Sequence, residues 1–149
     1  MDSVTRGLDL WNESLGEKIF RFAPIGEEPD VTVKFVRSLE QGGGDAQGFI
    51  DARREMSWSD RSHSYRLDAT IFVRDNLFGR SVHDDEVVAI VAHETGHLLG
   101  LADTDRDDRL MGPLLAGHPH DGPAEEEVAA VRTYRAAIRD AYPKRVDKR

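Results

Sequence analysis

The spacing of hydrophobic positions in the first part of the chain predicts a helix. Val4, Leu8, Trp11 and Leu15 recur every three to four residues, which is typical of an amphipathic helix with one apolar face. We therefore predict a helix over residues 3–16. The glycine at the end of this range is the residue type that most often ends a helix.

In the middle of the chain, apolar and polar side chains alternate with a period of two residues, which is typical of strands. Residues 31–35 alternate between apolar and polar side chains and predict a half-buried strand. Residues 48–51 predict a short strand, and the apolar, β-branched run 69–74 predicts a further strand. Residues 53–67 show neither period, so we predict a long surface loop there.

The second half of the chain returns to the helical period. Ser81 and Asp84 have the spacing of a capping box, and the apolar positions that follow predict a helix to about Leu99. Gly100 stands where a C-terminal glycine belongs. A last helical pattern covers residues 124–141. The order of helix, strands, helix, helix predicts an α+β domain with one sheet.

Composition narrows the classes of function. The 149 residues suit one domain, residues 1–149, and 39% of them are hydrophobic. No apolar run is long enough to span a bilayer, and residues 1–9 lack the apolar segment of a signal peptide. The absence of cysteine excludes disulfides, thiolate metal ligands and a cysteine nucleophile. A net charge of -8 argues against a nucleic-acid partner.

The segment from His93 to Asp103 (HETGHLLGLAD) carries the candidate chemistry. Residues four apart on a helix lie on one face, so His93 and His97 can offer ring nitrogens to one metal ion. A catalytic zinc site takes three protein ligands and keeps one position for water. Gly100 can break the helix, which lets Asp103 turn back and supply the third ligand.

Glu94 has the position of a general base. It neighbours His93 in the sequence but points about 100° around the helix, so it would sit beside the metal-bound water rather than on the metal. A carboxylate there can take the proton of a water molecule whose pKa the zinc lowers. Two histidines four apart can also have only a packing or capping role, and the added Gly100 and Asp103 make that reading much weaker.

HExxHxxGxx(H/D) followed by a methionine turn resembles the metzincin clan of zinc peptidases. Met111, in the sequence Arg-Leu-Met-Gly-Pro of residues 109–113, lies at a spacing similar to that of the matrixin turn. Asp103 in place of a third histidine is closer to the snapalysin-like pattern. The resemblance implies a twisted mixed sheet packed on an active-site helix, with an N-terminal subdomain over residues 1–100 and a smaller C-terminal one over 101–149.

The same resemblance implies a function and the position of the substrate. We expect one catalytic zinc ion and a monomeric endopeptidase that acts on protein or peptide substrates. The run 69–74 resembles the edge strand that binds substrate, which points to Ile71, Phe72 and Val73. Pro113 and Leu114 would wall the pocket next to the scissile bond, while Met111 would pack beneath the metal. Relatives are mostly secreted, and we expect the same here.

Two other functions stay open from the sequence. One is a zinc-stabilised binding domain without turnover, although a structural site needs no general base. The other is a small zinc hydrolase that processes RNA, although the acidic composition argues against it. Calcium could bind the acidic loop at Asp105, Asp107 and Asp108, but a solvated loop is the simpler reading, since no EF-hand spacing is present.

Overall fold

The first helix, α1 (Ser3–Leu15), has the bounds that its apolar spacing predicts. In the computed structural model, which describes residues 2–40, 46–59 and 62–141, Asp2 caps this helix by accepting a hydrogen bond from the backbone N–H of Thr5. Gly16 ends it with a φ of 66°, the left-handed conformation that glycine adopts without a steric penalty.

The strands form one mixed sheet and one small hairpin. The sheet has the order β1-β3-β2, with β1 (Val31–Val36) parallel to β3 (Ser62–Arg74) and β2 (Gly48–Ser59) antiparallel to it. The small hairpin is separate from this sheet and pairs β4 (Asn76–Leu77) with β5 (Arg80–Ser81). The predicted strands at 31–35, 48–51 and 69–74 are all present, and the last two belong to longer strands.

The loop predicted over residues 53–67 was wrong. Residues 53–59 and 62–67 belong to a long β2–β3 hairpin, whose register runs from Gly48 opposite Val73 to Ser59 opposite Ser62. The prediction failed because residues 51–57 of β2 are exposed on both faces of the hairpin. A period of two appears in a sequence only where one face of a strand is buried and the other is not.

The second helix, α2 (Asp84–Leu98), begins at a different cap from the predicted one. His83 is the N-cap residue, and its backbone N–H donates to the carboxylate of Glu86 at 2.8 Å. Ser81 lies instead in β5, so the predicted capping box over Ser81 and Asp84 was wrong. The last helix, α3 (Glu125–Ala141), agrees with the prediction.

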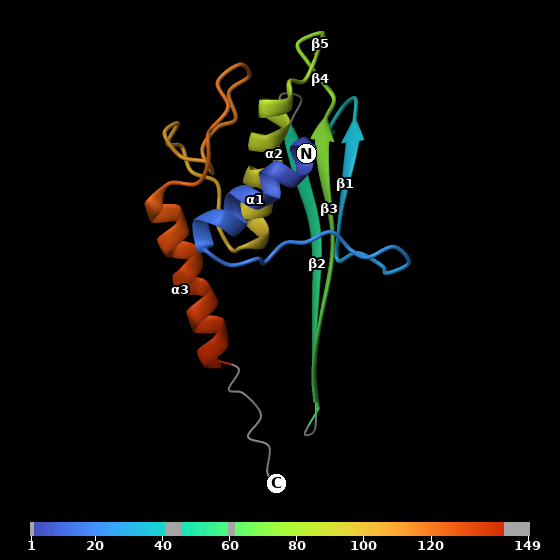
Figure 1. Cartoon of the computed structure of the whole chain (residues 1–149), viewed down its shortest axis with the longest axis vertical. Coiled ribbons are helices and arrows are strands. Elements are labelled where there is room, and N and C mark those ends of the chain that lie inside the picture. Colours follow the sequence, from blue (N-terminus) through green and yellow to red (C-terminus); the bar gives the residue numbers. More distant parts are fainter. Residues whose placement is uncertain (1, 41–45, 60–61, 142–149) are drawn as a thin grey trace.

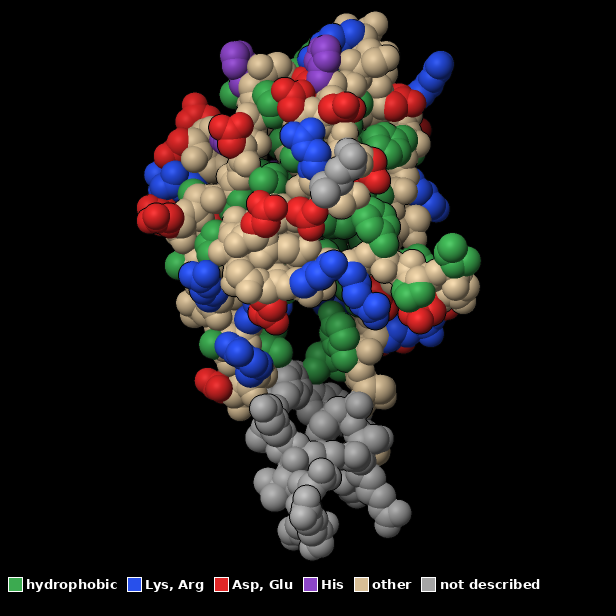
Figure 2. Space-filling view, viewed as in Figure 1, with side chains coloured by type: hydrophobic (Ala, Val, Ile, Leu, Met, Phe, Trp, Pro, Cys, Tyr) green, Lys and Arg blue, Asp and Glu red, His purple; other side chains and the backbone are tan. Residues whose placement is uncertain are grey.

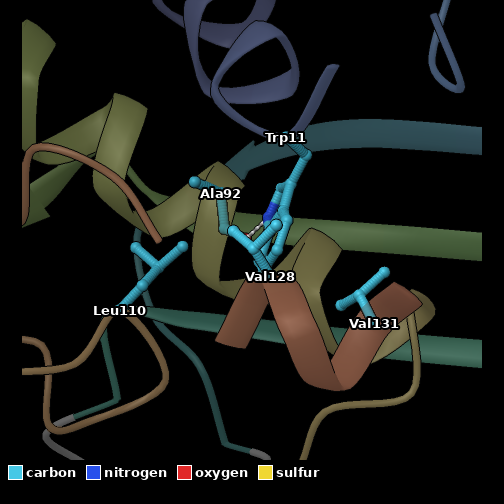
Figure 3. Packing of buried hydrophobic residues seen from close by; sticks show 5 residues of the cluster. All are labelled: Trp11, Ala92, Leu110, Val128 and Val131. Atoms are coloured by element: carbon cyan, nitrogen blue, oxygen red, sulfur yellow. Dashed lines mark hydrogen bonds between the residues drawn. The ribbon is translucent and has the colours of Figure 1, made fainter. Parts of the chain in front are cut away.

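Helices α1 and α2 lie on one face of the sheet, and α3 lies on their far side, away from the strands (Figure 1). Apolar residues of α1 and α2 pack against Ile71 and Val73 of β3, both fully buried. A second cluster joins the two ends of the chain: Trp11 of α1 packs with Ala92 and Leu110 and with two valines of α3 (Figure 3). The Trp11 indole N–H donates to the Ala92 carbonyl at 2.8 Å. The structure is therefore a small α+β domain with a shared core.

Candidate metal centre

His93 and His97 lie on the same side of the last turns of α2. Their ring centroids are 5.1 Å apart and the rings are nearly perpendicular, at 84°. His93 is buried and His97 is partly exposed at the end of the helix. The structure thus confirms that the spacing of four residues brings both imidazoles to one place.

The hydrogen bonds at the Nδ1 atoms of the two histidines fix their tautomers. Nδ1 of His93 lies 2.7 Å from the carbonyl oxygen of Leu110, and Nδ1 of His97 lies 2.8 Å from that of Leu101. A carbonyl only accepts hydrogen bonds, so each Nδ1 must carry the proton and donate it. In a neutral ring Nε2 then keeps its lone pair, as metal-binding histidines require.

Asp103 reaches the same point from outside the helix. Gly100 has a φ of 99°, and the chain turns back after it. The Oδ1 atom of Asp103 then lies 3.1 Å from Nε2 of His93 and 3.3 Å from Nε2 of His97. The three residues form a group whose ligand atoms all lie within 4.8 Å of one another. The predicted ligand set is therefore assembled.

Either a proton or a cation must occupy the point where these atoms meet. Two nitrogen lone pairs and a carboxylate oxygen repel one another when nothing positive lies between them. Burial lowers the pKa of His93, which disfavours the protonated ring that an ion pair with Asp103 would need. Neutral imidazoles and a carboxylate are suitable ligands for a transition-metal ion. The group can hold such an ion.

Glu94 is buried next to this group without belonging to it. Only 4% of its surface is exposed, and its side chain lines the same cavity as the two histidines. Burial raises the pKa of Glu94 to about 8, and the negative charge of Asp103 adds to the effect. Glu94 is thus a carboxyl group that binds a proton readily, at the place predicted for a general base.

The metal-ligand group opens into a cavity between two walls. One wall is the start of β2, at Gly48, Phe49 and Ile50. The opposite wall comes from the segment that follows Met111 and includes the predicted residues Pro113 and Leu114. The side chain of Gln47 joins the walls by donating a hydrogen bond to the Leu114 carbonyl.

The run predicted to be an edge strand is not at an edge of the sheet. Ile71, Phe72 and Val73 belong to β3, which is the central strand and pairs with β1 on one side and β2 on the other. Their backbone groups have no free edge for a substrate. Ile71 and Val73 point into the core, whereas Phe72 stacks on Phe49 with ring centroids 6.5 Å apart. The edge strand beside the cavity is β2.

Met111 is buried against α2, the helix that carries the two histidines. It is 2% exposed, and a Cβ atom added to Gly96 would lie only 2.4 Å from its sulfur atom. Glycine at position 96 therefore leaves room for the methionine.

Three residues that position the site were missed from the sequence. Glu127 of α3 is buried and accepts hydrogen bonds from the backbone N–H groups of Leu110 and Met111 at 3.2 and 2.8 Å. Glu86 accepts one from Gly117 at 2.7 Å. A Cβ atom on Gly48 would lie 2.7 Å from a carboxylate oxygen of Glu94. Their partners lie far away in the sequence, so no local spacing could reveal them.

The acidic loop after Asp103 forms no second site among the described residues. Asp108 pairs with Arg106 at 3.1 Å and with Arg109 at 2.7 Å, so its charge is neutralised within the chain. Arg109 also pairs with Glu126 of α3. The described part of this loop thus carries a network of surface ion pairs.

Comparison with known proteins assigns this chain to no family. No protein-family model matches the chain, and no curated protein matches it. In the part of the chain that the structure describes, no helix has the length and apolar character needed to cross a membrane. What is known of the site thus comes from its own residues: a His-His-Asp group that can hold a metal ion, beside a buried glutamate.

Proposed function

We propose that this protein is a zinc-dependent endopeptidase of the metzincin type. The observation that carries the proposal is the convergence of His93, His97 and Asp103 on one point, with the buried carboxyl group of Glu94 in the same cavity. Three nitrogen and oxygen ligands with an open side are typical of catalytic zinc, whereas structural zinc sites close all four positions. Zinc, when bound, would supply Lewis-acid activation of water and of the scissile carbonyl.

Glu94 would carry the proton through the reaction. Its ionised carboxylate would take a proton from the attacking water, and the resulting carboxylic acid would give that proton to the departing amine. The low exposure of Glu94 keeps competing water away from it. Glycine at position 48 leaves room for this carboxylate, because a Cβ atom there would lie 2.7 Å from one of its oxygens.

The substrate would lie between the two walls of the cavity. The outer edge of β2 at Gly48–Ile50 offers backbone groups for an added strand, which replaces the position on β3 expected from the sequence. Pro113 and Leu114 would contact the side chain next to the scissile bond. An apolar wall there favours an apolar side chain in the substrate.

A binding domain without turnover has less support. Such a domain has no use for a buried glutamate whose pKa is raised to about 8, because an unpaired buried carboxyl group costs stability. Asp103, the third ligand, is exposed on its outer side, so the group stays open to solvent rather than enclosed. Both features favour an enzyme.

The test combines metal content with proteolysis. Purified protein should bind about one zinc ion per chain and degrade casein, and a chelator should abolish the activity. Glu94→Gln should keep the zinc and lose about 10²–10⁴-fold in rate. Asp103→Ala should weaken zinc binding strongly, whereas the matched variant Asp105→Ala should not. Full zinc affinity in Asp103→Ala, or full activity in Glu94→Gln, would refute the proposal.

A further inference from the structure

The β2–β3 hairpin extends well beyond the part that the helices cover. We call its outer part, residues 53–59 and 62–67, the arm; in Figure 1 it projects past the end of α2. The arm begins where the guanidinium of Arg54 donates to the carbonyl of Leu98, the last residue of α2, at 2.9 Å. The core of the domain is complete without the arm, so packing does not explain its length.

The outer edge of β2 runs without a break from the cavity into the arm. In the sheet order β1-β3-β2 no other described strand pairs with this edge. Gly48, Phe49 and Ile50 line the cavity, and the following residues continue the same strand. At about 3.4 Å per residue, residues 51–55 add about 17 Å of edge beyond the cavity.

The hydrogen-bond register shows which backbone groups this edge presents. The N–H of Arg74 donates to the carbonyl of Gln47 at 2.9 Å, so residues 47 and 74 form a hydrogen-bonded pair. Such pairs alternate with non-hydrogen-bonded ones in an antiparallel ladder. The even-numbered residues of β2, including Ala52 and Arg54, therefore direct their N–H and C=O groups away from β3.

We propose that residues 51–55 of β2 are an extended subsite that binds the substrate polypeptide on the N-terminal side of the scissile bond. This inference rests on the proposed peptidase function. An added strand pairs somewhat more stably in the antiparallel direction. Because β2 runs from the cavity into the arm, an antiparallel substrate runs from the arm towards the metal centre. Its residues before the scissile bond then extend from the cavity along residues 51–55 into the arm.

The subsite selects for conformation more than for sequence. Its interactions are backbone hydrogen bonds, which every residue except proline can make. The neighbouring side chains carry charges of both signs, at Asp51, Arg53 and Glu55, so no single charge is favoured in the substrate. The substrate class is a polypeptide segment that can stay extended over about five residues before those in the cavity, such as an unfolded chain or a long loop.

Binding of uncleaved peptides tests the subsite directly. Fluorescent peptides with a fixed C-terminal half and two to eight residues before the scissile bond are titrated into zinc-loaded Glu94→Gln protein, and binding is measured by anisotropy. We expect Kd to fall about tenfold or more as the N-terminal half grows from three to eight residues. A matched series that is extended only on the C-terminal side should show no such gain.

N-methylation of single peptide bonds tests the register. In the eight-residue form, methyl groups on alternate residues should weaken binding about three- to tenfold, while those on the residues between should have little effect, because only every second N–H faces β2. On the protein, Ala52→Pro removes one outward N–H and should weaken binding of the long peptide only. Ala52→Ser keeps this N–H and serves as its control.

The outcomes separate this inference from the proposed function. If wild-type protein cleaves peptides but affinity does not depend on N-terminal length, or N-methylation shows no alternation, the extended subsite is refuted and the peptidase stands. If long peptides bind to the variant with the expected alternation but the wild type cleaves none, the subsite stands and the peptidase is refuted.

Discussion

The buried carboxyl group of Glu94 gives a test of the site in the absence of metal, through its pKa. The folded protein raises the pKa of this carboxyl group from the usual 4.5 to about 8. The folded state then holds a proton that the unfolded state has lost, so stability falls as the pH rises from about 4.5 to 8. A glutamine side chain does not ionise, so a protein with glutamine at this position does not lose this stability as the pH rises.

We predict that Glu94→Gln stabilises the chelated protein at alkaline pH. The gain in the free energy of unfolding should be about 1–3 kcal/mol at pH 8 and close to zero near pH 4.5. Urea titrations of both proteins across this range measure it. The exposed Glu125→Gln serves as the control and should show no gain that grows with pH. A constant difference at all pH values would contradict the prediction.

The group that can hold a metal ion could be predicted from the sequence, because its members follow local rules of helix geometry. The spacing of four residues aligns His93 with His97, and a glycine after the helix brings Asp103 back. Gly48 and Glu127 follow no such rule. Gly48 matters through its contact with Glu94, and Glu127 through hydrogen bonds to a turn sixteen and seventeen residues earlier. Only the folded chain brings these partners together.

The strands show what the pattern of apolar residues can predict about a strand and its place in the sheet. The run Ala69–Val73 was correctly predicted to be a strand, but its continuous apolar character is typical of a central strand rather than an edge. β3 is indeed central, which removes the edge that the resemblance to metzincins had suggested. The arm was missed for the opposite reason, since water surrounds both of its faces and leaves no apolar period.

The packing of α2 on the turn at Met111 gives a prediction at the scale of elements. A Cβ atom on Gly96 would lie 2.4 Å from the Met111 sulfur and 3.3 Å from a ring carbon of Trp11. Gly96→Ala should therefore push the turn away from α2 and lower the free energy of unfolding by about 1–3 kcal/mol. Because the Leu110 carbonyl in this turn orients His93, zinc affinity should fall as well.

The matched control for this substitution is Gly122→Ala. A Cβ atom there would meet only the Leu10 side chain, at an ordinary distance of 3.6 Å. Thermal unfolding and a chelator competition, run on both variants, separate a local clash from a general effect of alanine. Wild-type zinc affinity and stability in Gly96→Ala would show that the turn moves freely without disturbing the histidines.

At the scale of the whole molecule, two buried carboxylates tie the segments after the metal centre to the rest of the chain. Glu127 holds the Met111 turn on α3, and Glu86 in α2 holds Gly117 in the loop before α3. The shared core around Trp11 adds apolar contacts between the same regions (Figure 3). On the face seen in Figure 2, acidic and basic side chains are interspersed. Specific buried links, rather than surface charge, hold the C-terminal segments in place.

Glu86 makes this connection dependent on pH. Hydrogen bonds from Arg80, at 2.7 and 2.8 Å, and from backbone N–H groups lower the pKa of its carboxyl group from 4.5 to about 2. A lowered pKa in the folded state contributes stability above pH 4.5, and this contribution is lost as the pH falls towards 2.

Glu86→Gln should cost about 1–3 kcal/mol at pH 7, and the difference from wild type should shrink between pH 4.5 and 2. Urea titrations at several pH values measure both effects. Glu126→Gln, which breaks exposed ion pairs with Arg106 and Arg109, should leave the free energy of unfolding close to that of wild type at every pH. An equal loss at pH 7 and pH 2.5 for Glu86→Gln would mean that its charge does not secure the loop, and that packing alone connects the two regions.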